Sequence, residues 1–323
     1  MATASAGTKV VYILGPARTG SGVLGRILST IEGTAFAGEL RRLYSRGLRP
    51  DRTCSCGRPH AECPVWSRLL VPGAPYLDAG PEELRRVQRA AAPDRHPWIA
   101  ALRYLWRSST PLSETAAGRY LATYSDLHEA FARVTGTRVV INSSKTPAEA
   151  ALLAFAPGLA VTFVQMVRDP RGVAFSFQRH ARTSTRLAGH VAAIRAGSQW
   201  LARQLTNEMI RRRHGTDRWL VVRYERFVED PRPTVEAVAK MLGSSPPVAD
   251  LAPGIPITVP EAHGPDGSKR RRFVGTKVTL RSDDQWRTQL DRLDRVLVTL
   301  LTFPLLHRYG YPIRTLPLRI RKA

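Results

Sequence analysis

The first apolar run of the chain, Val10 to Leu14, has five hydrophobic residues in succession without alternation. Such a run is typical of a strand buried on both faces, as in a parallel sheet. The glycine-rich stretch 15–22 interrupts it, and apolar residues then recur at helical spacing from Val23 to Ile31. The pattern therefore predicts a strand, a tight loop and a helix in immediate succession.

Later apolar runs have the same unbroken character. We expect buried strands over residues 138–141, 160–167 and 219–223, and a short apolar piece over 35–40. Asp169 and Asp230 each precede a proline, and such pairs favour the first turn of a helix. Strands that alternate with helices indicate an α/β fold with a parallel sheet, in which ligands bind at the carboxyl ends of the strands.

Helical spacing predicts several longer helices. They are expected over residues 81–92, 120–134 and 191–211, and a last helix is expected to place Trp286, Leu290, Leu293, Leu297 and Leu300 on one face. The regular pattern fades between residues 45 and 135, where prolines, arginines and small residues are frequent. We interpret 45–135 as a largely helical and irregular insertion in a single domain that spans residues 1–323.

The composition raises the question of why the chain carries a large positive net charge. The chain has 323 residues, of which 43% are hydrophobic, so it can bury a large core. Its formal net charge of +23 favours polyanionic partners, yet long basic blocks are absent and short basic runs occur at 269–272 and 319–322. We attribute most of the charge to an arginine-rich composition and expect no nucleic-acid partner.

The sequence contains no apolar run long enough to cross a membrane. The stretch 297–306 is too short and is interrupted by Thr302 and Pro304. The first residues are small and polar and do not resemble a secretory signal. We therefore expect a cytoplasmic protein whose three cysteines are reduced.

The loop after the first strand has part of the pattern of a nucleotide-binding P-loop. Gly15 and Gly20 have the separation found in that motif, but Ser21 replaces its lysine and Gly22 replaces its magnesium-binding hydroxyl. Arg18 is the cation within the loop. Free N–H groups and the helix dipole favour an anion at such a point, so we expect a phosphate-like ligand without the usual Mg²⁺. The alternative is a tight turn that binds nothing.

Five short motifs follow one another along the chain. They are GPARTGSG at 15–22, CSCG with a later CPVW within 54–66, NSSKTP at 142–147, RDPRGVAFS at 168–176 and RYE at 223–225. Together they resemble the sulfotransferases that use 3′-phosphoadenylyl sulfate (PAPS), in particular the bacterial branch, over residues 9–300 and most weakly over 67–135. The resemblance implies the sulfotransferase fold, a P-loop-like parallel β-sheet flanked by helices. It also implies sulfuryl transfer to a hydroxyl or amine of a small-molecule or carbohydrate acceptor, which the insertion would cover.

The resemblance also implies roles for individual residues. It assigns the 5′-phosphosulfate to Arg18, Thr19, Gly20, Ser21 and Gly22, and further donor contacts to Arg168, Ser176, Tyr224, Lys269, Arg270 and Arg271. Of these, Arg168 and Ser176 are expected to hold the 3′-phosphate, and the basic run 269–271 to close over the nucleotide. The alternatives are a structural ion pair of Arg168 with Asp169 or Glu225, and a basic run that is merely solvated.

Sulfuryl transfer requires a base for the acceptor hydroxyl and a cation beside the leaving oxygen. By the same resemblance, Glu39 is the candidate base and Lys145 the candidate cation. Glu39 could instead cap a helix or lie at the surface, and the alternative bases are then His60, His96, His128 and His180. The family's usual aspartate before Ser-Ser-Lys is Asn142 here, so a role that requires a carboxylate at that position is in doubt.

A zinc site could be formed by Cys54, Cys56, His60 and Cys63, although this spacing is uncommon for one. We favour reduced cysteines that pack a loop near Trp66, and we expect no metal. Two other classes of function remain open, a P-loop kinase or NTPase and a non-catalytic polyanion-binding protein. The sequence identifies neither the acceptor nor the oligomeric state.

Overall fold

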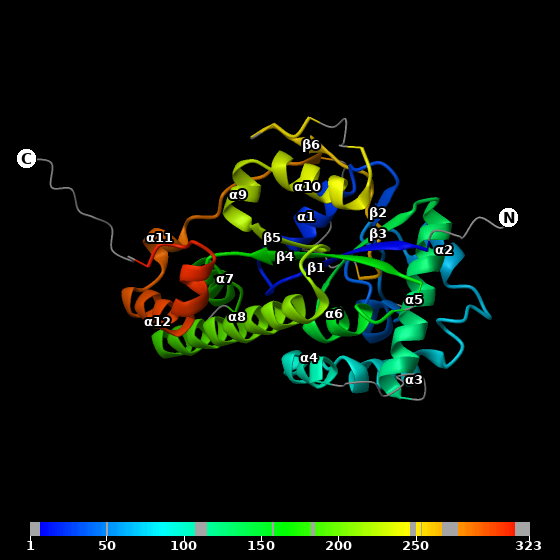
Figure 1. The fold of residues 1–323 in the computed structure, drawn as a ribbon, viewed down its shortest axis with the longest axis horizontal. Helices are drawn as coiled ribbons and strands as arrows, with labels where there is room; N and C mark the ends of the chain where they lie inside the picture. Colours follow the sequence, from blue (N-terminus) through cyan, green and yellow to red (C-terminus); the bar gives the residue numbers. More distant parts are fainter. Residues whose placement is uncertain are drawn as a thin grey trace, which may run out of the picture.

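A five-stranded parallel sheet forms the centre of the molecule (Figure 1). The computed structural model describes residues 7–49, 51–106, 115–156, 158–181, 185–245, 250–252, 254–266 and 277–313. The strand order is β2-β3-β1-β4-β5, and all neighbouring strands are parallel. Their bounds are β1 (Lys9–Leu14), β2 (Thr34–Phe36), β3 (Val139–Lys145), β4 (Ala160–Val167) and β5 (Trp219–Arg223). The parallel α/β sheet expected from the sequence is confirmed.

Helices cover both faces of this sheet (Figure 1). One face carries α1 (Ser21–Leu28), α9 (Tyr224–Glu229) and α10 (Arg232–Leu242). The other carries α5 (Ala116–Thr135), α6 (Pro147–Leu153) and α8 (Arg186–His214). A separate group at the left of Figure 1 consists of α7 (Pro170–Ala181), α11 (Trp286–Gln289) and α12 (Arg292–Arg308). None of the helices described here is long and apolar enough to cross a membrane.

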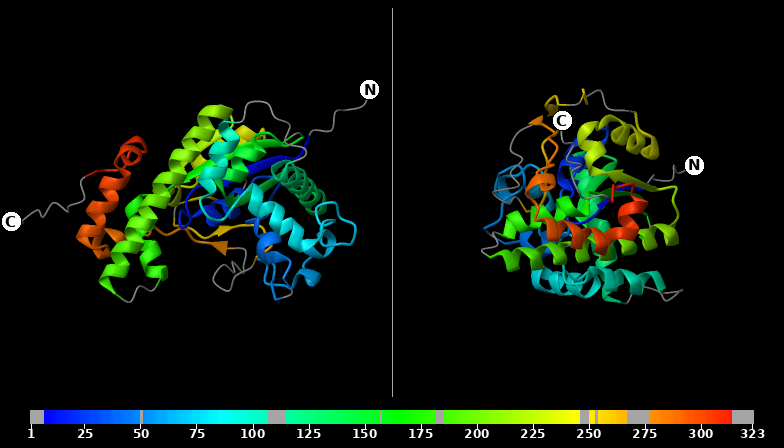
Figure 2. Two further views of the ribbon diagram at one scale, coloured as in Figure 1. Left: turned by 90° about the horizontal axis from the view of Figure 1, so that it is seen from below. Right: turned by 90° about the vertical axis from the view of Figure 1, so that its left-hand side faces the viewer.

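The region expected to be an insertion forms an additional layer on the α8 face of the sheet. It contains η1 (Leu43–Gly47), η2 (His60–Glu62), α2 (Trp66–Leu69), α3 (Gly80–Ala91) and α4 (Pro97–Trp106), and it continues into α5. α4 contacts α6 and α8 on their outer side, which the right-hand view of Figure 2 shows. A short antiparallel pair, β6 (Ile257–Thr258) with β7 (Lys277–Val278), lies apart from the main sheet. The region is therefore mostly helical, as expected.

β1 explains why the first apolar run does not alternate. Residues 10–14 are fully buried. Val11 and Ile13 belong to the core on the α1 face, whereas Tyr12 and Leu14 belong to the core on the α5 and α6 face. Both faces of a central parallel strand are covered by helices, so both sets of side chains must be apolar.

The carboxyl-terminal helices differ from the expectation of one continuous apolar face, which is wrong. α11 ends before Asp291, whose carboxylate accepts a hydrogen bond from the Leu293 N–H (2.8 Å) and starts α12. Leu293 and Leu300 are 50% and 67% exposed, and the buried face of α12 includes Val298 and Leu305 instead. A capping aspartate thus overrides the apolar periodicity and rotates the second helix into a new register.

A buried carboxylate network lies on the α5 and α6 face of the sheet. Glu149 is fully buried and accepts hydrogen bonds from the hydroxyls of Tyr12 (2.9 Å), Tyr120 (2.8 Å) and Tyr124 (3.3 Å) and from Nε of Arg41 (3.0 Å). Burial and the charge of Glu149 raise the pKa of all three tyrosines, which keeps them protonated as donors. The arginine supplies the compensating charge that a buried carboxylate needs.

Candidate active site

The loop between β1 and α1 adopts a conformation that depends on its glycines. Gly15 has φ 137°, and a Cβ there would lie 2.5 Å from the carbonyl oxygen of Met166. Gly20 has φ 80° directly before α1, and a Cβ there would lie 2.8 Å from the ring of Tyr224. Arg18 between them also has a positive φ, 72°. Other residues are strained in this region of backbone space, so glycines permit the turn.

The amino end of α1 offers mainly backbone N–H groups to a ligand. The hydroxyl of Thr19 donates to the carbonyl of Pro16 (2.8 Å) and is therefore engaged within the loop. Ser21 is buried, and no acidic residue lies in the first turn of α1. The positive end of the helix dipole is consequently not neutralised by the helix's own side chains, which favours an anion at this point.

Glu39 and Lys145 form an ion pair close to this loop. Nζ of Lys145 lies 2.5 Å from Oε1 of Glu39, and the side chains are only 14% and 12% exposed. Oε2 of Glu39 accepts a hydrogen bond from Nε of Arg42. Sequence analysis therefore identified two residues that are in contact although they are 106 positions apart in the chain. A surface location for Glu39 is excluded by its burial.

The backbone at the end of β3 is distorted where it presents Lys145. The register between β1 and β3 shifts between Tyr12 and Leu14, and Leu14 pairs with Lys145 across the shift. Lys145 has φ 64°, a left-handed conformation that is uncommon for residues with a side chain. Irregularities of this kind re-aim a side chain at the edge of a sheet, and here the lysine turns toward Glu39.

Asp266 extends the charged cluster on the other side of Arg42. Its side chain is 5% exposed and lies within 4.0 Å of Arg42, Arg46 and Arg52. A cavity of about 60 Å³ is lined by residues that include Gly22, Glu39, Arg42, Ser143 and Asp266. The candidate base Glu39 and Gly22 at the amino end of α1 therefore face one small space, and Lys145 is linked to it through its ion pair with Glu39.

Arg168 links this loop to two other segments. It is buried at the end of β4, and its Nη1 donates to the carbonyl of Arg18 (2.9 Å). Its Nη2 donates to the backbone carbonyl and to a carboxylate oxygen of Asp283, both at 3.1 Å. The guanidinium also lies 4.6 Å from the ring centroid of Tyr224. The residues implied for the donor from three strand ends are thus in mutual contact.

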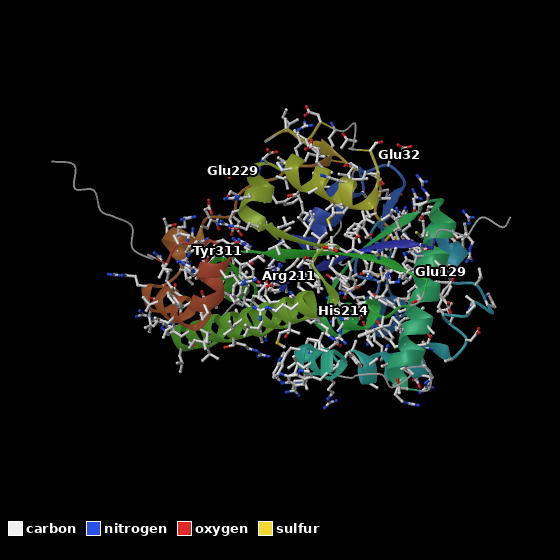
Figure 3. All side chains as sticks on the ribbon, in the orientation of Figure 1. Glu32, Glu129, Arg211, His214, Glu229 and Tyr311 are labelled. Carbon is white, nitrogen blue, oxygen red and sulfur yellow. The ribbon has the colours of Figure 1, made fainter. Side chains whose placement is uncertain are left out.

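The alternative partners considered for Arg168 are engaged elsewhere. Asp169 forms a salt bridge with Arg171 (2.6 Å), and its N–H donates to Glu225 (2.9 Å). Glu225 also accepts from the hydroxyl of Tyr311 (2.7 Å), which Figure 3 labels on the α12 side of the molecule. Among the described residues Arg168 pairs with Asp283 and not with Asp169 or Glu225, the partners considered as an alternative.

α7 brings a second arginine to Asp283. Ser176 is buried on this helix, and Arg179 lies three residues further along it. Nη2 of Arg179 is 3.6 Å from the Asp283 carboxylate, and its Nη1 donates to Gln285 (2.8 Å). A carboxylate of the chain itself thus lies between two arginines. Sequence reasoning missed Arg179 and Asp283, and only the position of Arg179 in the motif RDPRGVAFSFQR offered a signal.

The basic run expected to close over the nucleotide cannot be placed. Lys269, Arg270 and Arg271 lie outside the described residues, which stop at Asp266 and resume at Lys277. The roles assigned to them therefore stay predictions.

His128 occupies a structural position and not that of a base. Burial lowers its pKa to about 4, and its Nδ1–H donates to the carbonyl of Tyr124 (2.6 Å). Its Nε2 accepts from the side-chain amide of Asn142 (2.9 Å), which also donates to the hydroxyl of Tyr124 (2.8 Å). Asn142 in turn accepts from the Ser144 N–H (2.9 Å). The amide that replaces the family's aspartate therefore belongs to a hydrogen-bonded network below the strand.

A larger cavity of about 530 Å³ lies between α4 and α8. Its lining includes Asp94, His96, Trp98, Arg195 and Arg203. Burial and the charge of Arg41 lower the pKa of Arg203, whereas the charges of Asp94 and Glu39 act in the opposite direction. Asp94 in the wall of this cavity accepts a hydrogen bond from Nη1 of Arg41 (2.6 Å), two positions after Glu39.

Comparisons with known proteins agree with the family and the fold. A family model described as "Sulfotransferase family" matches residues 11–247, and a search of curated proteins finds no significant match. The sulfotransferase domain of the olefin synthase from Synechococcus PCC 7002 is similar in structure, with 20% identity, coverage of 98% of each chain and a TM-score of 0.51.

Two further solved structures are similar at lower scores. The sulfotransferase domain from the curacin biosynthetic pathway is 16% identical, with 95% of this chain and 99% of that chain covered and a TM-score of 0.48. A sulfotransferase from Alicyclobacillus acidocaldarius is 17% identical, with 92% and 95% covered and a TM-score of 0.43. Because the family model spans most of the sequence and the parallel sheet is the expected one, the chain belongs to the sulfotransferase family.

Proposed function

We propose that this protein transfers a sulfuryl group from PAPS to a hydroxyl or amine of a small-molecule or carbohydrate acceptor. One observation carries the proposal: Gly22 at the amino end of α1 and Glu39, whose carboxylate is paired with Lys145, line the same cavity. Arg168 is bonded to the same loop from the neighbouring strand end. Because the chain belongs to the sulfotransferase family, we assign sulfuryl transfer to this arrangement.

The donor site is proposed around the loop and Arg168. A phosphosulfate carries less negative charge than a free triphosphate, so N–H groups, the helix dipole and Arg18 are sufficient without the P-loop lysine and Mg²⁺. A second phosphate on the ribose requires its own cations, which Arg168 and Arg179 can supply. Ser176, buried on the same helix as Arg179, is proposed to donate a hydrogen bond to that phosphate.

Glu39 is proposed to accept the proton of the acceptor hydroxyl. As the O–H bond breaks, its electron pair forms the new bond from the acceptor oxygen to sulfur. The bond from sulfur to the bridging oxygen of the donor breaks, and its electron pair stays on that oxygen. Arg42, bonded to the second oxygen of Glu39, fixes the orientation of the carboxylate during this transfer.

Lys145 is proposed to stabilise the negative charge on the departing bridging oxygen. An ammonium group has three donors, so the lysine can retain its bond to Glu39 and donate to a second oxygen at the same time. The ion pair is largely buried, and an interaction with developing charge is stronger there than in water. Proton acceptance and leaving-group stabilisation are thus assigned to two paired residues.

The acceptor is proposed to bind in the cavity between α4 and α8. Trp98 offers an aromatic surface, and Arg195 and Arg203 offer hydrogen-bond donors. The cavity belongs in part to the region 45–135, which the sequence predicts to cover the acceptor. Sugars and aromatic alcohols are the acceptor classes to test first, because both suit an aromatic wall with polar donors.

Ligand titration separates this proposal from its alternatives. Isothermal calorimetry compares adenosine 3′,5′-bisphosphate, ATP with Mg²⁺, and a random DNA duplex. Tight binding of the bisphosphate alone is expected; preference for ATP with Mg²⁺ would indicate a kinase or NTPase, and preference for DNA a polyanion-binding protein. Labelled PAPS is then incubated with a panel of sugars, phenols and amines to test transfer. A protein that neither binds nor hydrolyses PAPS would contradict the proposal.

A further inference from the structure

Four soft ligand atoms meet beside the active site, outside the residues used for donor or acceptor. They are Sγ of Cys54, Cys56 and Cys63 and a ring nitrogen of His263, and all lie within 4.8 Å of one another. Cys54 and Cys63 are fully buried, and Cys56 is half-buried. The histidine comes from a segment about 200 positions away, whereas His60, the histidine in the sequence pattern, is not part of the group.

The distances within the group suit a single tetrahedral ion. Nδ1 of His263 is 3.4 Å from Sγ of Cys63 and 3.7 Å from Sγ of Cys54. A tetrahedral Zn²⁺ with ordinary Zn–S and Zn–N bonds places sulfur and nitrogen ligands roughly 3.5 Å apart. The carboxylate of Glu261 lies 3.7 Å from Nε2, the other ring nitrogen. Metal-bound histidines commonly direct that nitrogen to a carboxylate.

The backbone around the cysteines forms a tight turn that directs the sulfurs inward. The Gly57 N–H donates to the carbonyl of Cys54 (2.9 Å), and Gly57 has φ 92°. The N–H groups of Cys56 and Trp66 donate to Sγ of Cys54 (3.4 Å) and of Cys63 (3.5 Å). Hydrogen bonds of this kind stabilise the negative charge of metal-bound thiolates.

Separate hydrogen bonds hold the histidine segment in place. Ser55 Oγ donates to the carbonyl of Ala262 (2.7 Å) and accepts from the Gly264 N–H (2.6 Å). The indole N–H of Trp66 donates to the carbonyl of His263 (2.9 Å). The four ligands are therefore positioned by contacts that do not depend on an ion, as a specific metal site requires.

We propose that Cys54, Cys56, Cys63 and His263 bind one structural Zn²⁺. Three thiolates and an imidazole fill all four tetrahedral positions, so the ion has no open position for catalysis. The ion would join the turn 54–57 to the segment that leads to Asp266. Gly264 in that segment packs against Gly38, next to the candidate base, so that a Cβ on Gly38 would lie 2.9 Å from the Cα of Gly264. The site would thereby fix one wall of the small cavity.

Metal analysis of the purified full chain tests the proposal without any activity assay. Protein produced in medium with Zn²⁺ and purified under reducing conditions is expected to contain about one zinc ion per chain, measured by inductively coupled plasma mass spectrometry. Co²⁺ substitution is expected to give the intense visible absorption of a tetrahedral thiolate complex. Cys56→Ser and His263→Gln are expected to lose most of the metal, and His60→Ala, the matched control, to retain it.

Three results would overturn the zinc assignment. One is protein that contains no zinc and binds none on reconstitution with Zn²⁺ under reducing conditions, while its three thiols react with a thiol reagent in the folded state. Another is zinc retained at the wild-type level in both Cys56→Ser and His263→Gln. A disulfide among these cysteines, found by mass spectrometry of the protein purified under reducing conditions, would equally exclude the site. Circular dichroism of each variant establishes that it is folded.

Discussion

Glu39→Gln is the substitution that tests the catalytic assignment most directly. Glutamine has the size of glutamate and can still accept a hydrogen bond from Lys145, but it cannot take up the proton of the acceptor. The side chain lies 2.5 Å from Nζ of Lys145 and is only 12% exposed, so the variant is expected to keep its place in the cavity. The change therefore removes basicity and charge with little loss of shape.

The substitution is expected to lower both kcat and the free energy of unfolding. A positioned base contributes on the order of 10²-fold or more to kcat, which corresponds to about 2.7 kcal/mol of transition-state free energy. Loss of one charge from a largely buried, hydrogen-bonded pair costs about 1–3 kcal/mol of folding free energy. The variant should thus fold with a lowered melting temperature, bind donor nearly as well as the wild type, and turn over at least about 100-fold more slowly.

Arg42→Gln provides the matched control. It breaks the second contact of Glu39 but leaves the carboxylate in place, so a comparable loss of stability is expected with a fall in kcat of less than about tenfold. Initial rates with labelled PAPS, donor affinity by calorimetry and melting temperatures are measured for both variants. In the wild type the acidic limb of the kcat profile reports the base, and this limb should flatten in Glu39→Gln.

Two outcomes would refute the reasoning. A Glu39→Gln enzyme with the wild-type kcat would exclude the carboxylate as the base and direct attention to His96, which lines the larger cavity. Equal losses in Glu39→Gln and Arg42→Gln, with an unchanged pH profile, would show that the charge network as a whole matters and that proton transfer occurs elsewhere.

Three further expectations concern the donor site. Arg168→Ala should weaken adenosine 3′,5′-bisphosphate several-fold more than its 3′-hydroxyl analogue in calorimetry, and equal losses would assign Arg168 to the fold alone. Gly20→Ala should destabilise the chain by about 1–2 kcal/mol and also weaken donor binding, because its Cβ would meet the Tyr224 ring. Gly136→Ala, also at positive φ but with nothing within 4 Å of its Cβ, should lose stability only. Equal donor affinities of the Gly20→Ala and Gly136→Ala variants would contradict the role of the loop in donor binding. Turnover should persist without added divalent ions and after brief treatment with EDTA, and strict dependence on Mg²⁺ would favour a kinase.

The sheet and the loop were predictable from the sequence because their signals are local. Residues 10–14 are apolar without alternation, since helices cover both faces of β1, and the glycines after them are demanded by the turn itself. The carboxyl-terminal helices show where local signals conflict. Apolar spacing across Asp291 predicts one helix, but the capping side chain ends one helix and starts another. Periodicity alone could not show which signal prevails.

The partners within the site could not be predicted, because they depend on packing between distant segments. Asp283 is 115 positions from Arg168, and His263 is 209 positions from Cys54. Neither has a neighbour in the sequence that marks it as a partner. Glu39 and Lys145 were selected by the resemblance to the sulfotransferases, and they meet because each lies beside a strand end at one edge of a parallel sheet.

Arg41 and Arg42, which are adjacent in the chain, connect the candidate base to the protein core through ion pairs. Arg41 bonds to the buried carboxylate of Glu149, and Arg42 bonds to Glu39. The segment that carries the base is therefore anchored on both sides, and a change at Glu149 should alter the energy of the Glu39–Lys145 contact without touching it. A double-mutant cycle between Glu149 and Lys145 would then show thermodynamic coupling between the two positions. Substitutions in the buried network around Glu149 would therefore change activity and stability together.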